Sequence, residues 1–256
     1  MSTTTRRGLS TAAGAGAVVG GYRKAATAVV FQAMVSGIAS TVAVQGDTGV
    51  VIAIQATALN TDQVIINAAI TYVNGLGGGS VFVDEGTYTL GANVVVLALV
   101  YLYGSGCATI LTIPAATDNC IEVNAVTDWK IALMTLRTTG AGANDVISLT
   151  NADDGCIFSV HIDDSGQDGI SLFAASDHVD IHDNKISGCA RFGINNRSDD
   201  NHFVANRIDD TGDDGIFLQA GGTNCLCALN RISGWTGEAI DNNEPSVEVA
   251  HNQLIV

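Results

Sequence analysis

The chain has 256 residues, of which 47% are hydrophobic and 14% are charged. This is enough apolar material for a long core, and it excludes intrinsic disorder. The 26 acidic and 11 basic residues give a net charge of −15, which argues against nucleic acid or an anionic membrane as a partner, because both need a surplus of Lys and Arg. An acidic surface instead fits a neutral or cation-bridged partner.

The chain is rich in glycine and poor in proline, with 29 and 2 residues, a balance typical of many tight corners between short strands. Its six cysteines lack zinc-binding spacing and are few for a disulfide scaffold. We therefore expect them to be small buried side chains, and we expect no required cofactor. The cysteines are Cys107, Cys120, Cys156, Cys189, Cys225 and Cys227.

Residues 1–27 are expected to form an N-terminal tail. Arg6 and Arg7 resemble a weak twin-arginine export signal, but the stretch that follows them is poorly hydrophobic, so the role of the tail as signal or arm stays open. Residues 28–59 are expected to be a lead-in or cap of short strands. The uncharged run 25–44 is about the length of a membrane span, but its polar residues and two strand-like segments predict a hairpin without membrane insertion.

Residues 60–76 are predicted to form a capping helix. Asn60 or Thr61 can cap its start, Ile66, Ile70 and Val73 share one face, and the glycines at 75–79 end it. We expect this helix to cover the N-terminal end of the core, which would otherwise expose strand edges. Residues 77–256 are then the repeating part.

A repeat of 22 to 24 residues organises the second half of the chain, in four columns that keep one register. The reference column is Ile162, Ile186, Ile208, Ile232 and Leu254. Two residues earlier stand Val160, Asn184, Asn206, Asn230 and Asn252, and five residues earlier stand Ile157, Ile181, Phe203, Cys227 and Val249. Eight residues later stand Ile170, Ile194, Ile216 and Ile240, preceded by Gly169, Gly193, Gly215 and Ala239.

This periodicity predicts an all-β fold, a single-stranded right-handed parallel β-helix with an N-terminal capping helix. Each repeat is too short to bury its own apolar face, so successive coils must stack at the strand spacing of roughly 4.8 Å. The isoleucines then form an internal ladder and the asparagines a ladder of amides at a bend. Asparagine suits that bend because it tolerates a left-handed backbone and satisfies buried backbone groups, and the glycines mark another corner.

Four segments carry a resemblance to a known superfamily: QVIINAAI at residues 63–70, GGGSVFVDEGTYTL at 77–90, VYLYGSG at 100–106 and TIL at 109–111. They resemble the opening of pectin-lyase-like β-helix proteins, which include pectate lyases, polygalacturonases, uronan epimerases and phage tailspikes. The strands of the lead-in are closest in style to those of viral and archaeal members. The resemblance covers residues 28–256 and implies the fold, but it is nearly silent on activity, because this scaffold supports many chemistries.

One candidate site lies on the strands before the asparagines. Asp180 and His182 fall on one coil and His202 on the next, so Asp180 and His202 should stack and could act as a carboxylate-oriented general base. The same columns hold apolar residues such as Phe158 and Leu226. The alternative, which we favour, is therefore a subunit interface, or a surface under the N-terminal segment, with satisfied histidines.

A second candidate site is an acidic corner. Asp214 and Glu238 lie on adjacent coils and could approach the roughly 5 Å separation of a retaining glycosidase pair. Together with Asp213 they could instead bind calcium, which takes several carboxylate oxygens. The favoured alternative is ordinary turn chemistry, because Asp-Gly pairs suit tight turns.

Three hypotheses follow for the function. The preferred one is a virion-associated or extracellular cell-surface β-helix, tailspike-like, that contacts polysaccharide. The second is a carbohydrate-active enzyme (a polysaccharide lyase, glycoside hydrolase or epimerase), although the polygalacturonase triplet Gly-His-Gly is missing from the sequence. The third is a purely structural subunit. The apolar outer columns and a last coil without a cap predict a homo-oligomer, with a trimer as the expected form, or a larger assembly.

Overall fold

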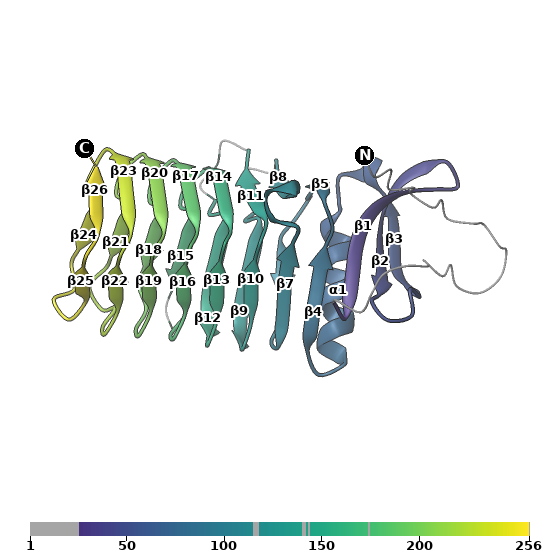
Figure 1. Cartoon of the computed structure of the whole chain (residues 1–256), viewed down its shortest axis with the longest axis horizontal. Helices are drawn as coiled ribbons and strands as arrows, with labels where there is room; N and C mark the ends of the chain where they lie inside the picture. Colours follow the sequence, from purple (N-terminus) through teal and green to yellow (C-terminus); the bar gives the residue numbers. More distant parts are fainter. Residues whose placement is uncertain (1–25, 115–117, 140–141, 143, 174, 256) are drawn as a thin grey trace, which may run out of the picture.

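The computed structural model describes residues 26–114, 118–139, 142, 144–173 and 175–255. The possible export signal at Arg6 and Arg7 lies outside these residues. The described chain winds into coils that stack along one long axis, with the only α-helix and the three antiparallel strands of this described part at its N-terminal end (Figure 1). Three parallel sheets run along the axis, and the chain visits them in turn on each coil.

Sheet A has 11 strands and includes the lead-in. Its strands are β1 Ala28–Val35, β2 Ile38–Gln45, β3 Val51–Ala56, β4 Gly79–Val83, β7 Val100–Gly104, β10 Lys130–Ala132, β13 Cys156–Phe158, β16 Asp180–His182, β19 His202–Val204, β22 Leu226–Ala228 and β25 Glu248–Ala250. β1 pairs antiparallel with β2 and parallel with β4. The predicted hairpin is therefore confirmed, and it extends sheet A of the β-helix beyond β4.

Sheets B and C have eight and seven strands. Sheet B contains β5 Gly86–Thr89, β8 Thr109–Ile113, β11 Thr135–Thr138, β14 His161–Ser165, β17 Lys185–Cys189, β20 Arg207–Thr211, β23 Arg231–Trp235 and β26 Gln253–Ile255. Sheet C contains β6 Val94–Val96, β9 Ile121–Thr127, β12 Ile147–Asp153, β15 Ile170–Phe173, β18 Ile194–Asn196, β21 Ile216–Leu218 and β24 Ile240–Asn242. Two 3-10 turns span Thr57–Leu59 and Gly106–Ala108.

The predicted columns are confirmed as stacked neighbours. Ile162 pairs with Ile186, Ile186 with Ile208 and Ile208 with Ile232, and all four are fully buried. The columns that begin at Ile157 in sheet A and Ile170 in sheet C pair in the same way. Buried aliphatic side chains stacked along the axis therefore form one continuous core.

The predicted asparagine ladder is also confirmed at the corner between sheets A and B. Oδ1 of Asn206 accepts the backbone N–H and the Nδ2 of Asn184, at 3.1 and 3.0 Å, while its own Nδ2 donates to the carbonyl of Ile181. The left-handed residue is not the asparagine, however, but the one before it: Asp183, Ala205, Leu229 and His251 have φ between 54° and 59°. Leu133 and Ser159 take the same place on earlier coils, before Met134 and Val160, with φ of 56° and 52°. Asparagine is used here for its amide and not for its backbone freedom.

The glycines that precede the strands of sheet C are needed because the next coil leaves no room for a side chain. A Cβ on Gly193 would lie 2.6 Å from the carbonyl oxygen of Gly215 and 2.6 Å from a methyl of Ile208. Gly169 and Gly215 are equally crowded by the next coil, and none of the three has a positive φ. The prediction of a glycine corner is right, and close packing of successive coils is its reason.

The predicted cap is confirmed as helix α1, Gln63–Gly75. Ile66, Ile70 and Val73 are fully buried against the core. The proposed caps Asn60 and Thr61 are wrong, because the residue that precedes the helix is Asp62, whose carboxylate instead accepts bonds from Thr41 Oγ1 and the backbone of Thr89. Asp62 thus ties the helix to the lead-in and the first coil. Among the described residues, α1 and the other helical turns are all too short to cross a membrane.

Candidate functional site

The predicted pair on sheet A is in contact. Asp180 of β16 and His202 of β19 are register partners, and Nδ1 of His202 lies 2.9 Å from Oδ1 of Asp180. Both side chains are exposed, at 57% and 52% of their surface. A carboxylate at this position can orient the imidazole ring through a hydrogen bond. The stacking is therefore confirmed, whereas the catalytic role of the pair stays a prediction.

His182, the third member of this patch, belongs to a different set of contacts. Its Nδ1 lies 2.9 Å from the carboxylate of Asp183, and its Nε2 lies 3.5 Å from the thiol of Cys156. Its ring stacks on Phe158 with a centroid distance of 5.5 Å and an interplanar angle of 5°. His182 is thus held in place by three neighbours, and it ends a row of rings.

This row, here called the aromatic row, consists of Phe82, Tyr103, Tyr101, Phe158 and His182. Successive centroids are 5.2, 4.6, 6.1 and 5.5 Å apart. These are the separations at which aromatic pairs attract one another. Ala132 stands between Tyr103 and Phe158 in the sheet register and is fully buried. A small residue at this position lets the rings of neighbouring coils close over it.

The aromatic row is half-buried on the outer face of sheet A. At its N-terminal end, Phe82 and Tyr103 pack against a separate apolar cluster that includes Val29 and Phe31 of β1. At its other end lie the exposed Asp180 and His202. The row therefore forms a flat strip that is apolar at one end and charged at the other.

Burial raises the pKa of the Tyr101 and Tyr103 hydroxyls, and the pKa of the Cys156 thiol rises to about 11 through burial and the charge of Asp180. All three groups stay neutral near pH 7. Hydroxyls that stay protonated can donate hydrogen bonds at the edge of the strip. The thiol is not a nucleophile under these conditions.

At the acidic corner, Asp214 and Glu238 are neighbours, as predicted, but Asp214 is used by the backbone. Its Oδ1 accepts the N–H of Glu238 at 2.7 Å, and Asp214 is only 6% exposed. Burial, followed by the charges of Asp213, Asp241 and Glu238, raises its pKa in spite of this bond. The contact is what turn chemistry predicts, and the glycosidase-like role of the pair stays a prediction.

The described part of the chain holds no group of three or more His, Cys, Asp or Glu side chains arranged to bind a metal ion. The possible calcium site at Asp213, Asp214 and Glu238 therefore remains a prediction without a preformed cluster.

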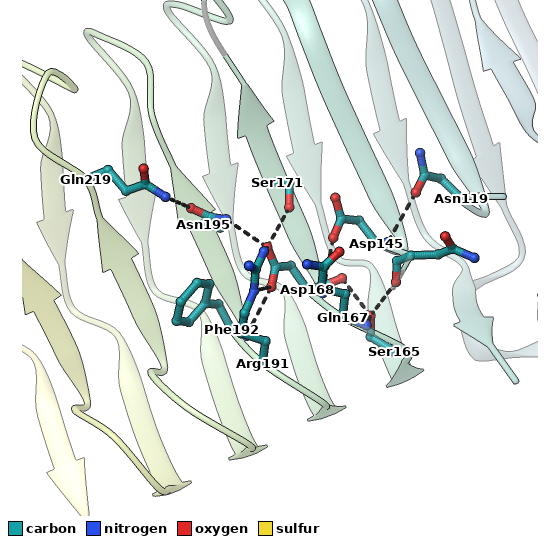
Figure 2. Close-up of polar contacts among 11 residues, drawn as sticks. Asn119, Asp145, Ser165, Gln167, Asp168, Ser171, Arg191, Phe192, Asn195 and Gln219 are labelled. Atoms are coloured by element: carbon teal, nitrogen blue, oxygen red, sulfur yellow. Dashed lines mark hydrogen bonds and ion pairs between the residues drawn. The ribbon is translucent and has the colours of Figure 1, made fainter. Parts of the chain in front are cut away.

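A third polar group surrounds Asp168, which belongs to the predicted acidic corner because it stands in the same sequence column as Asp214 and Glu238; the network of bonds around it was not predicted. Arg191 binds both oxygens of Asp168, with Nε to Oδ1 at 2.7 Å and Nη2 to Oδ2 at 2.6 Å. Asn195 and Ser171 add side-chain bonds of 2.8 and 3.0 Å, and the backbone of Phe192 adds one of 3.3 Å. Figure 2 shows these groups converging on Asp168 at the corner between sheets B and C.

Next to Asp168 lies Asp145, only 5% exposed, whose Oδ1 accepts the Asp168 N–H at 3.2 Å. Burial first and the charge of Asp168 second raise the pKa of Asp145 to about 6. A carboxyl group whose pKa is raised in this way occurs in many acid–base catalytic sites. Asp168, however, is fully buried. We therefore interpret this network as the support of the corner, which also holds the guanidinium of Arg191 4.6 Å from the ring of Phe192.

Sequence reasoning missed the aromatic row, although the signal was present. In Tyr101-Leu102-Tyr103 the central leucine is buried and the tyrosines are half-exposed, and this alternation predicts two outward rings on one strand. The Asp168 network was not predicted, because Asp145 belongs to an earlier coil in which the sequence departs from the regular repeat: the register partners Leu136 and Ile162 are 26 residues apart.

These features define a class of protein, a parallel β-helix whose outer sheet faces carry organised aromatic and charged side chains. The chain belongs to the family described as right handed beta helix region, whose model matches residues 119–255. The match covers more than half of the chain and confirms the predicted fold class. No curated protein matches the sequence.

Solved structures with this fold include proteins of several kinds. Gene product 12 of bacteriophage phi29 is 14% identical, with a TM-score of 0.60, over 76% of this chain and 32% of that one. Tailspike protein 2 of the Escherichia coli bacteriophage CAB120 is 12% identical, with a TM-score of 0.54, over 76% and 31%. An alginate lyase from Paenibacillus is 16% identical, with a TM-score of 0.54, over 74% and 71%.

The chain spans about a third of the length of the two phage proteins. At these identities the likeness is one of fold. It confirms the resemblance to pectin-lyase-like β-helix proteins, tailspikes among them.

Proposed function

We propose that this β-helix is a recognition protein on a virion or cell surface that binds polysaccharide along the outer face of sheet A. The observation that carries the proposal is the aromatic row, which leads to the exposed Asp180 and His202. A sugar ring has an apolar face and a rim of hydroxyls, so it suits flat aromatic side chains flanked by hydrogen-bonding groups. A phage tailspike and a lyase that acts on alginate share the fold, which agrees with a glycan ligand.

The arrangement favours recognition over catalysis. Asp180 and His202 are each more than half exposed to solvent, whereas catalytic acids and bases work in sites that exclude water. The binding strip needs neither a metal nor an activated thiol. The alternative interpretation is that this face of sheet A is a subunit interface. In that case light scattering should give a solution mass three times that of one chain, as expected for a homotrimer.

Binding to a panel of bacterial surface glycans and uronans tests the proposal. Tyr101→Ala and Phe158→Ala should each weaken binding of the best glycan about tenfold, since an aromatic stacking contact contributes about 0.5–1.5 kcal/mol beyond area burial. Phe173→Ala is the matched control, because Phe173 is equally half-buried but lies on sheet C. Unchanged affinity in both sheet A variants would rule out the aromatic row as the binding surface.

The enzyme hypothesis predicts a different result in the same assay. If Asp180 and His202 are catalytic, the panel should yield new reducing ends or ultraviolet-absorbing unsaturated products, and His202→Ala should abolish them while binding persists. Binding without any product, in the wild type and in His202→Ala alike, supports recognition.

A further inference from the structure

One strand of sheet A has a free edge at the N-terminal end of the molecule. β3 is the last strand in the order of this sheet and pairs with β2 on one side. Among the described residues, no strand pairs with its other side, and Figure 1 shows β3 at the end of the stack that carries the lead-in. The main-chain N–H and C=O groups along this edge are therefore available to another strand.

β3 lacks the features that usually protect an edge strand. Natural edge strands carry a charge, a proline or a bulge that prevents pairing, whereas the sequence of β3, VIAIQA, contains neither a charged residue nor a proline. The register with β2 is irregular only near Val51, and the pairs from Ala53 to Ala56 are regular. An uncharged apolar segment of this kind pairs readily with another strand.

Exposed apolar side chains flank the free edge. Ile52 and Ala53 of β3 pack against the core that contains α1, whereas Ile54 is the register partner of Val42 on the outer face and is 47% exposed. Leu59, which follows β3 in the first 3-10 turn, is 61% exposed. A strand that pairs with β3 would remove part of this apolar surface from water, which adds to the main-chain hydrogen bonds.

The lead-in is also the neutral part of a strongly acidic chain. The net charge of the chain is −15, yet residues 26–61 contain a single charged residue, Asp47. Two copies of an acidic protein repel one another when their charged surfaces approach. This repulsion is smallest where both copies present the lead-in, so a second copy of the chain fits the edge of β3 by charge.

The described chain enters sheet A on the side away from this edge. The N–H of Thr27 donates to the carbonyl of Ser80 of β4, and the carbonyl of Thr27 accepts the N–H of Gly46. This entry point lies beside β4, and β1 and β2 separate it from the free edge of β3. A strand from a second molecule can reach the edge without crossing the sheet, which favours an occupant from outside the chain.

We infer that β3 pairs antiparallel with β3 of a second copy of this chain, so that sheet A continues through a twofold dimer. An identical strand is self-complementary in this orientation, because every contact between residues i and j is repeated as a contact between j and i. Antiparallel strands also exchange their N–H···O bonds directly across the pair. The dimer closes the free edge, and it requires no charged group at the interface.

This dimer leaves the aromatic row uncovered and duplicates it. The twofold axis of an antiparallel pair of identical strands is perpendicular to the sheet, so the outer faces of both copies of sheet A point to the same side. Two aromatic rows can then contact one polysaccharide, which raises the affinity without a new contact. This last consequence rests on the proposed function, whereas the pairing of β3 does not.

Analytical ultracentrifugation of the full chain over a range of concentrations tests the inference. The mass of the wild type should rise from one chain to two with concentration. Ile54→Lys should stay a single chain over the same range, since a lysine on an edge strand opposes pairing. Leu229→Lys is the matched control, because Leu229 is equally exposed and apolar but lies between β22 and β23 on a distant coil; it should dimerise like the wild type.

Hydrogen exchange of the wild type locates the contact without a variant, and the β3 amides should become more protected as the concentration rises. The inference is overturned by a wild type that stays monomeric, by a trimer, or by a dimer that Ile54→Lys leaves intact. Full protection of β3 in the monomer also overturns it and assigns the edge to residues 1–25. Because no glycan is present, none of these outcomes bears on the proposed function.

Discussion

Nδ2 of Asn206 donates a hydrogen bond to Oδ1 of Asn230 on the next coil at 3.1 Å. The same relationship joins Asn184 to Asn206 and Asn230 to Asn252, so a single file of amides runs through four coils. Each amide also satisfies a backbone carbonyl of the preceding coil, Ile181 in the case of Asn206. The ladder therefore links the stability of each coil to that of its neighbours, as expected of a repeat protein.

Asn206→Ala should lower the free energy of unfolding by about 2–4 kcal/mol, because it leaves a buried backbone N–H and a buried carbonyl without partners. Asn243→Ala is the control: Asn243 is exposed and its side chain bonds to Asp241, so loss of the amide should change stability by less than about 0.5 kcal/mol. Urea unfolding followed by circular dichroism measures both. Equal midpoints would contradict a structural role for the ladder.

Gly193→Ala should destabilise the chain by about 1–3 kcal/mol, because the added methyl overlaps the carbonyl of Gly215 and forces the coils apart. The same substitution at Gly75, the last residue of α1, meets nothing within 4 Å. Gly75→Ala should therefore be neutral or stabilising by up to about 1 kcal/mol. Thermal unfolding of the two variants compares one change in two environments, and equal melting temperatures would refute the close-packing explanation.

Asp145 should make stability depend on pH. Its pKa is raised to about 6 in the folded chain by burial and by Asp168, so the folded state holds its proton more tightly than the unfolded state. The stabilisation by this group is fully present below the unfolded pKa, about 3.9, and is lost as the pH rises through 6; its full size is about 3 kcal/mol. Asp145→Asn should flatten this part of the profile.

The measurement is the difference in unfolding free energy between wild type and Asp145→Asn from pH 4 to pH 8. Glu122→Gln, a carboxylate of sheet C that is only partly buried, serves as the control. A difference between wild type and Asp145→Asn that does not vary with pH would mean that Asp145 titrates as an ordinary aspartate.

One cysteine should react rapidly with a thiol reagent. All six are free, and only Cys107 is exposed. Burial raises the pKa of Cys120 and Cys227 to about 12 and that of Cys189 as well, and a buried thiol is inert. Iodoacetamide on the native chain should add one label by mass spectrometry, and Cys107→Ser should abolish it. Rapid labelling at two or more sites would show that the core opens.

The sequence alone was sufficient for the fold. Stacked coils place equivalent residues on top of one another, so the register of the strands follows directly from the columns that begin at Ile162 and Asn184. The apolar face with Ile66 and Ile70 identifies the helix that covers the end of the core. The reasons for particular residues were harder to predict. Neither the left-handed residue before each asparagine nor the contact that makes Gly193 necessary can be read from a column, since both depend on the path of the backbone between strands.

Only the tertiary structure decided which outer side chains meet. The repeat predicted that Asp180 and His202 are neighbours, because both lie in regular coils. It did not join Tyr101 to Phe158 or Asp145 to Asp168, because the reference column is irregular in the earlier coils, where Leu111, Leu136 and Ile162 follow one another at 25 and 26 residues. Inward positions are dictated by burial, which the sequence records as hydrophobicity, whereas the contacts of outward positions depend on side chains of other coils.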